Sequence, residues 1–227
     1  EWYMQMMLQR AWVNHRYLVI LMTVTAIVHG VITVHVARNI PSIVGGTDSR
    51  WSKTAEHLYL DGVYAAGDRR DAAGDIIPTG GVPPFYTFAY AGSYALFGVG
   101  QAAHEAMRVL QVLLNLGIIL VVWRIGLLFD RRTGYAAATI AAADFTALFF
   151  ALNYDLPDVA VGFFTALSVL FLVKFLRRAQ SVRTLVYSAL FLGLAMWTKE
   201  TVYLLWVPVV GFLVIWMRWG ADLAWTV

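Results

Sequence analysis

The feature that most constrains this chain is a series of long apolar segments separated by short charged turns and one large polar loop. Apolar residues make up 60% of the sequence and charged residues only 14%, whereas soluble domains are about 45–50% apolar and about 25% charged. A helix of about 20 apolar residues crosses the ~30 Å hydrocarbon core of a bilayer. The sequence therefore predicts an all-α, multi-pass transmembrane helical bundle.

Six segments are the expected spans. They cover residues 17–37, 109–129, 135–152, 156–176, 184–198 and 202–219. The first is longer than the apolar region of a signal peptide, which is about 7–15 residues, so we expect it to be a retained helix. We expect residues 1–227 to form a single transmembrane domain.

The polar loop follows the first span directly. Residues 38–84 hold six of the 14 acidic residues and five of the 17 basic ones. Trp51, Ala55 and Leu58 recur at helical spacing and predict an amphipathic helix over residues 48–64 that lies on the membrane. The polar side chains of this helix are expected to point away from the apolar stripe; they are Arg50, Lys53, Glu56 and His57.

The rest of the loop divides into two parts. Residues 67–81, rich in Asp, Arg and Gly, are expected to form a flexible connector. Residues 85–99 are apolar but too short to span, so we expect a juxtamembrane or re-entrant helix that belongs to an outer loop over residues 38–104. The preceding Pro83-Pro84 favours a first helical turn, and Gly98 favours a helix end.

Arginine and lysine predict the orientation. They cluster at Arg10 and Arg16, at Arg131 and Arg132, at Lys174, Arg177, Arg178 and Arg183, and at Arg218. These clusters fall on one side if the spans alternate, and the positive-inside rule makes that side, with the N-terminus, cytoplasmic. The 38–104 loop, the turn 153–158 and residues 198–200 then meet on the periplasmic or extracellular face of the cell membrane.

A series of short motifs runs in order along nearly the whole chain. They are Asp48-Ser49-Arg50-Trp51, Ala55, Gly62-Val63-Tyr64, Pro83-Pro84-Phe85-Tyr86, Phe97-Gly98, Arg108-Val109-Leu110-Gln111, residues 129–134 and residues 193–199. In this order they resemble the N-terminal half of the GT-C class of membrane glycosyltransferases, in the branch of protein O-mannosyltransferases and lipid A aminoarabinose transferases. Relatives usually continue with more helices, so the resemblance implies that this sequence covers only part of such a protein.

The resemblance implies transfer of a sugar from a polyprenyl-phosphate donor to an acceptor at the outer membrane face. Asp48 would be the base that accepts the proton of the attacking hydroxyl, and Asp155 or Asp158 would be the second acid. Three cations would stabilise the departing lipid phosphate, on which negative charge grows in the transition state; these are Arg50, Arg108 and Lys199.

The chain departs from the family pattern at two places. The family acid precedes its aromatic residue by four positions and its alanine by eight, whereas Asp48 precedes Trp51 by three and Ala55 by seven. Either the helix start shifts by one residue, or Thr47 stands at the catalytic position and activity is weakened or lost. Val82 stands where a lysine often precedes the two prolines, so one expected phosphate ligand is replaced.

Each candidate also has a purely structural interpretation. Asp48, Asp155 and Asp158 stand near helix starts, where carboxylates are favoured caps. Lys199 could pair with the glutamate that follows it, and Arg108 could simply extend toward the headgroups.

Other polar groups bear on cofactors. Glu56 and His57 with Asp61 could bind a divalent cation, although no cofactor is certain, and no cysteine is present for disulfides or thiolate sites. Asp144 falls in the middle of the expected 135–152 span, where a charge is costly. His29 and His35 are six residues apart rather than four, so we expect packing rather than metal binding.

Two functions from different classes therefore stay open. The first is glycosyl transfer, with a polyprenyl-phosphate sugar and membrane lipids as partners and no nucleic acid. The second is a non-catalytic membrane subunit that keeps the GT-C-like fold and packs against other membrane subunits. A transporter is less favoured, because the spans lack paired, Gly- or Pro-broken helices in matching halves.

Overall fold

The computed structural model describes residues 2–39, 50–67, 69–78, 82–144, 156–179, 181–199 and 202. In this part of the chain every regular element is a helix, and the only β pairing is an isolated bridge between Arg70 and Ile76. The predicted all-α class is confirmed.

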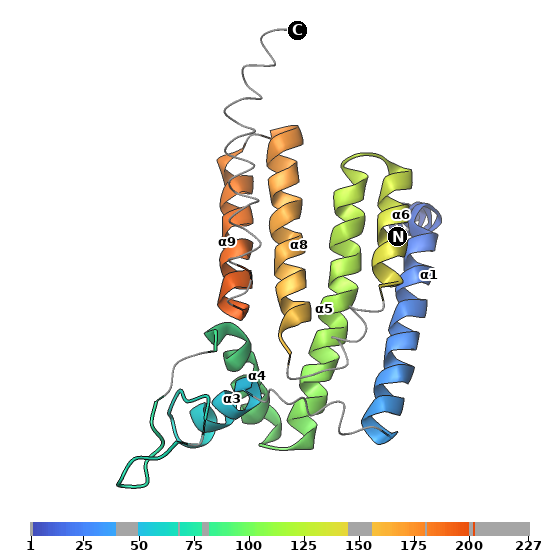
Figure 1. The fold of residues 1–227 in the computed structure, drawn as a ribbon. Helices are drawn as coiled ribbons and strands as arrows, with labels where there is room; N and C mark the ends of the chain where they lie inside the picture. Colours follow the sequence, from blue (N-terminus) through green and yellow to red (C-terminus); the bar gives the residue numbers. More distant parts are fainter. Residues whose placement is uncertain are drawn as a thin grey trace.

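The helices form a bundle with a cap at one end. They are α1 (Trp2–Asn39), α3 (Arg50–Leu60), α4 (Pro84–Phe97), α5 (Gln101–Leu127), α6 (Arg131–Ala142), α8 (Asp158–Lys174) and α9 (Val182–Thr198), with a π-helical turn, Phe175–Ala179, after α8. Helices α1, α5, α8 and α9 run side by side, and α6 folds back beside α5 (Figure 1). Helices α3 and α4 lie at the end where α5 and α8 begin and α9 ends.

Three helices are long and apolar enough to cross a membrane, so the multi-pass prediction is confirmed. These segments are His15–Ile32, Gln101–Leu127 and Asp158–Arg177, and α9 is a shorter apolar helix. The expected 135–152 span is helical to Ala142 and then leaves the helix. Asp144 lies just past that end and is exposed; its placement in the middle of a span stays a prediction. Residues 145–155 and 203–219 lie outside the described residues.

Helix α4 has the bounds that proline and glycine predict. Pro84 occupies its first turn, and Gly98 ends it at φ 76° with its N–H bound to the Tyr94 carbonyl. This positive φ is strained for any residue but glycine. The helix presents Tyr86, Tyr90 and Tyr94, spaced by four residues, to a single buried face.

These three tyrosines, which we call the tyrosine ladder, join the cap to the bundle. They pack in one core with Trp51 and Ala55 of α3, Ala103 and Met107 of α5, and Ala160 of α8. Buried aromatic hydroxyls usually require hydrogen-bond partners, and the Tyr90 hydroxyl lies 2.7 Å from His104 Nδ1. The ladder therefore attaches α3 and α4 firmly to the first turns of α5.

Helix α3 is amphipathic as predicted, except at His57. Trp51 and Ala55 are buried, but so is His57, which was expected to point outward. Its Nδ1 lies 2.9 Å from the Ala65 carbonyl, because the chain after α3 turns back over the helix. The nearby Tyr64 hydroxyl donates to the Val82 carbonyl at 2.5 Å, and burial raises the pKa of Tyr64, which keeps this donor protonated.

The connector after α3 contains an ordered turn where we expected a flexible segment. The Asp71 carboxylate accepts hydrogen bonds from the backbone N–H groups of Ala73 at 2.8 Å and Asp75 at 3.0 Å. The bridge from Arg70 to Ile76 closes the turn. An aspartate side chain that binds its own following backbone groups is a common way to fix such turns.

Two contacts fix the helix pairs along the bundle. The Ser168 hydroxyl of α8 donates to the Ser188 carbonyl of α9 at 2.8 Å, and the Ser188 hydroxyl donates back to the Ser168 carbonyl at 2.9 Å. His29 of α1 is buried, and its Nε2 lies 3.3 Å from the Asn115 amide nitrogen of α5. The packed role expected for His29 is in accord with this position.

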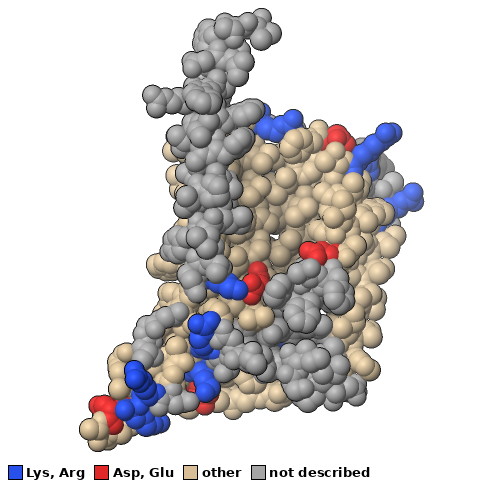
Figure 2. All heavy atoms as spheres, in the orientation of Figure 1, with Lys and Arg blue, Asp and Glu red and all other residues tan. Residues whose placement is uncertain are grey.

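Basic residues lie at the end of the bundle opposite α3 and α4. Arg131 and Arg132 begin α6, and Lys174, Arg177 and Arg183 lie around the junction of α8 and α9 (Figure 1). Asp130 caps α6 there, and hydrogen bonds from the Thr133 hydroxyl and N–H lower the pKa of this carboxyl. Figure 2 shows charged side chains at the upper edge of one face, a second group near its middle and a third at the lower left, with uncharged surface between the first two groups.

We predict that Gly126→Ala destabilises the bundle. A Cβ at Gly126 of α5 would lie 2.6 Å from the Gly134 Cα of α6, and backbone cannot move aside as a side chain can. Overpacking of this kind costs about 1–3 kcal/mol. Thermal unfolding in detergent should show a lower midpoint.

The matched control is Gly92→Ala, on the exposed side of α4. Its Cβ would meet nothing within 4 Å, and alanine favours a helix over glycine by about 0.8–1 kcal/mol. Gly92→Ala should therefore keep or raise the midpoint. Equal losses in the two variants would refute close helix packing as the cause.

Candidate functional site

An ion pair joins two helix ends beneath the cap. The Lys199 ammonium lies 2.7 Å from Asp158 Oδ1, with the two side chains 22% and 26% exposed. Asp158 is the first residue of α8, and Lys199 follows the last residue of α9. Because α8 and α9 run antiparallel, the start of one meets the end of the other. Two candidates 41 residues apart in sequence are thus in direct contact.

The geometry of this pair leaves one carboxylate oxygen unused. Asp158 Oδ2 is buried and has no hydrogen-bond partner among the described residues. Lys199 still has ammonium hydrogens to offer, since an ammonium group carries three donors. A partly exposed cation beside a carboxylate can bind a phosphate oxygen and retain a counter-ion when the site is empty.

Arg108 is the most deeply buried of the candidate cations. It lies in α5, two turns from its start, with its side chain 4% exposed, and it pairs with Glu105. The expectation that it simply extends toward the headgroups was wrong, because the side chain turns inward rather than outward. A buried guanidinium with a carboxylate partner is held in one orientation.

A glutamine connects α5 to the start of α8. The Gln111 side-chain N–H₂ group donates to the Tyr86 hydroxyl at 2.8 Å and to the Leu156 carbonyl. Leu156 stands two residues before Asp158, so α4, α5 and the start of α8 meet at this amide. In the sequence Gln111 stood out only as the last residue of the Arg108–Gln111 motif, with no role of its own.

Arg50 begins α3 and is exposed, and its guanidinium carbon lies 5.7 Å from the centre of the Trp51 ring. It belongs to the cap rather than to the ion pair. Asp48 and Asp155 lie outside the described residues, as does Glu200, the other partner considered for Lys199. The roles assigned to all of these residues stay predictions.

The described residues do not build a metal centre. Within the described ranges, no three His, Asp or Glu side chains gather closely enough to hold an ion. These ranges include the candidates Glu56, His57 and Asp61. The Nδ1 atom of His57 is already hydrogen-bonded to the Ala65 carbonyl. A divalent cation stays a prediction without a site in this part of the chain.

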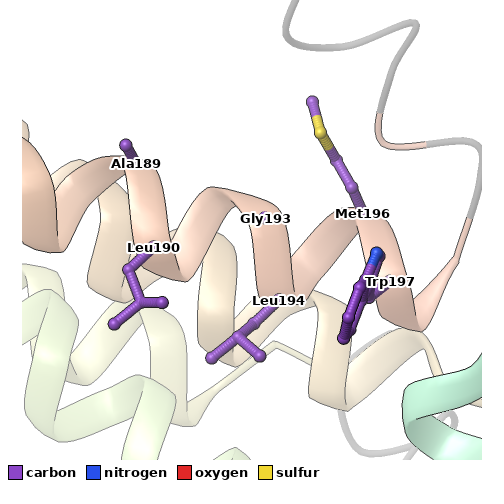
Figure 3. Close-up of a pocket in the computed structure, with 6 residues that line it drawn as sticks. All are labelled: Ala189, Leu190, Gly193, Leu194, Met196 and Trp197. Carbon is purple, nitrogen blue, oxygen red and sulfur yellow. The ribbon is translucent and has the colours of Figure 1, made fainter.

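An apolar groove lies along α9, the helix that ends one residue before Lys199. It has a volume of about 400 Å³ and is lined by Ala189, Leu190, Gly193, Leu194, Met196 and Trp197. Leu190, Leu194 and Trp197 point to the same side of the helix, and Met196 points to another (Figure 3). The groove reaches Trp197, two residues before Lys199, so an apolar surface borders the charged end of the bundle.

The described chain is thus a helical membrane bundle with a cap at one end, a lysine–aspartate pair and a buried arginine. The family of dolichyl-phosphate-mannose-protein mannosyltransferases matches residues 81–225. The chain belongs to this family, which confirms the resemblance inferred from its motifs. No curated protein and no solved structure matches the chain.

We predict that Asp158 and Lys199 stabilise the fold through each other. Exposed ion pairs contribute about 0–1 kcal/mol, and loss of one partner from a fully buried pair costs about 3–5 kcal/mol. For this half-buried pair we expect a coupling of about 1–2 kcal/mol, between those limits.

A double-mutant cycle measures this coupling. It compares the unfolding free energies of the parent protein, Asp158→Asn, Lys199→Met and the double variant. The double variant should lose less than the sum of the single losses. Additive losses, within about 0.5 kcal/mol, would show that the contact contributes nothing to the folded state.

Proposed function

We propose that this chain transfers a sugar from a polyprenyl-phosphate donor to a hydroxyl acceptor at the outer face of the membrane. The single observation that carries the proposal is the contact between Lys199 and Asp158 at the capped end of the bundle. A lipid-linked sugar needs a polar site for its phosphate and an apolar surface for its tail. The ion pair and the α9 groove offer both within one short stretch of α9.

In this reaction the acceptor oxygen attacks the anomeric carbon as the bond from that carbon to the phosphate oxygen breaks. The electron pair of the broken bond remains on the phosphate, whose growing charge Lys199 stabilises. The proton of the acceptor hydroxyl passes to a carboxylate, for which Asp48 is our candidate. Asp158 holds Lys199 in place before the donor binds.

Arg108 and Arg50 are the further cations of the proposed site. Gln111, one turn beyond Arg108 on α5, reaches the residues just before Asp158, which supports a place for the buried guanidinium near the phosphate. Arg50 lies in the cap, where it could meet a polar headgroup from the aqueous side.

The proposed orientation follows from the basic residues. Arg131, Arg132, Arg177 and Arg183 lie at the end away from the cap. The positive-inside rule would place that end in the cytoplasm and the cap, with the 38–104 loop, in the periplasm or outside the cell.

One observation favours the alternative function, a non-catalytic subunit. Val82 is buried and its carbonyl accepts the Tyr64 hydroxyl, so the position where relatives often carry a phosphate-binding lysine serves the core here. The purified full-length protein should distinguish the two functions. Sugar transfer by this protein alone supports the enzyme, and a folded full-length protein that transfers nothing supports the subunit.

We predict that Asp48→Asn and Asp48→Ala both lower sugar transfer. Removal of a general base costs about 10²–10⁴-fold. Asparagine separates the two interpretations of this residue, because it caps a helix as well as aspartate does but cannot accept the proton. The measurement is transfer from a polyprenyl-phosphate sugar to a soluble acceptor.

Asp75→Asn is the control, since it removes an exposed carboxylate from the same loop. It should leave transfer unchanged. Full activity in Asp48→Asn, with lower thermal stability in Asp48→Ala only, would reduce Asp48 to a cap and remove it as the base.

We also predict that Lys199→Gln lowers transfer. Loss of one charged group that stabilises a developing oxyanion costs about 10²–10³-fold in kcat. Lys174→Gln removes an equivalent charge from the opposite end of the bundle and should leave kcat unchanged. Equal losses in Lys199→Gln and Lys174→Gln would place the effect in overall charge rather than in the site.

A further inference from the structure

We infer that Gln111 is a positioning residue that holds the start of α8, and with it Asp158, in the working position. The inference rests on the proposed function and deepens it by adding a residue that touches neither donor nor acceptor. It follows from the contacts, the burial and the hydrogen-bond chemistry of this one amide.

The contacts of Gln111 span the site. Its N–H₂ group donates both hydrogens, one to the Tyr86 hydroxyl and one to the Leu156 carbonyl. Tyr86 belongs to the tyrosine ladder of α4, which is part of the cap. Leu156 lies directly before the first turn of α8. One side chain of α5 therefore fixes the cap and the start of α8 at a common point.

Burial makes this attachment strong. Gln111 is 0% exposed, so water cannot replace either hydrogen bond. The part-buried Leu156 carbonyl precedes the helix and has no place in its hydrogen-bond ladder, and a shielded carbonyl without a donor is costly. The amide cannot be reversed either, because its oxygen would then face the carbonyl oxygen, and two acceptors repel.

The position of Asp158 depends on this attachment. Asp158 is only two residues from the Leu156 carbonyl, and Pro157 between them restricts the backbone. The Lys199 ammonium in turn donates to Asp158 Oδ1 at 2.7 Å. A shift at Leu156 is thus transmitted through the stiff Pro157 to the ion pair that we propose to face the donor phosphate.

Gln111→Met is the test variant, because methionine fills a similar volume and donates no hydrogen bond. Misplacement of reacting groups by about 1 Å can cost 10²-fold in rate, so kcat for sugar transfer should fall by about 10- to 100-fold. The KM for the lipid donor should change by less than about threefold, because an interaction that matters in the transition state lowers kcat more than it changes KM.

Asn115→Met is the matched control. Asn115 lies one turn further along the same face of α5, is 2% exposed, and contacts His29 of α1 rather than α8. The Asn115→Met substitution therefore removes an equally buried amide from the same helix. If loss of any buried amide in α5 lowered kcat to the same extent, the positioning role of Gln111 would be overturned.

Tyr86→Phe adds a second test of the same attachment. It removes one acceptor of the Gln111 amide and leaves the bond to Leu156. It should lower kcat less than Gln111→Met does, and the double variant should be no slower than Gln111→Met alone. Additive losses would mean that Tyr86 and Gln111 act separately, which contradicts the inference.

A labelling experiment tests the attachment without any activity. The chain has no cysteine, so Leu156→Cys creates a unique thiol beside the carbonyl in question. Loss of a buried hydrogen bond should raise local opening, and thus the maleimide labelling rate, by about tenfold in Gln111→Met. Asn115→Met should leave the rate unchanged.

The two readouts separate the two claims. Unchanged labelling in Gln111→Met overturns the attachment, whatever the activity. If Gln111→Met labels faster but the parent protein transfers no sugar, the attachment is upheld and the proposed function is refuted. Faster labelling together with the selective loss of kcat supports both.

Discussion

The constraint on which this structure depends is the lack of water within a bilayer. A polar side chain on a spanning helix must find its partner inside the protein or reach the membrane surface. In this chain Arg108, Gln111, Asp158 and Lys199 lie toward one end of α5, α8 and α9, and each has a partner in the protein. The requirement to satisfy these groups gathers them where the apolar bundle ends, and a polar site results.

The tyrosine ladder explains how the cap becomes part of this site. A short amphipathic helix at a membrane surface is held mainly by its apolar face, and α3 and α4 would have little to fix their position without further contacts. Tyr86, Tyr90 and Tyr94 bury large rings against α3 and α5, and their hydroxyls reach Gln111, His104 and the Ser52 carbonyl. Apolar packing of the rings stabilises the contact, and the hydrogen bonds of the hydroxyls fix the orientation of α4.

Local signals predicted most of the fold. Prolines and a glycine gave both ends of α4, and the long apolar runs predicted the spanning helices. The error was at His57, whose burial depends on a returning loop, and helix α6 also ends earlier than its apolar run predicted. Neither event has a local signal, because tertiary contacts decide both.

The candidate site was less predictable for the same reason. Asp158 and Lys199 stood out as charges at the ends of apolar runs, and topology alone suggested that they share one end. The role of Gln111 could not be read from sequence, because its partner carbonyl lies 45 residues away and any residue could supply a carbonyl. Its only signal was an amide within an apolar run.

The reciprocal serine bonds between α8 and α9 have a consequence for movement. Ser168 and Ser188 each donate to the backbone of the other helix, so the two helices are fixed lengthwise at mid-depth. Sliding of one helix past the other would break both bonds at once within the apolar layer. Any separation of Asp158 from Lys199 would then come from side-chain rotation, or from bending and fraying of the helix ends beyond these serines, and not from sliding of whole helices.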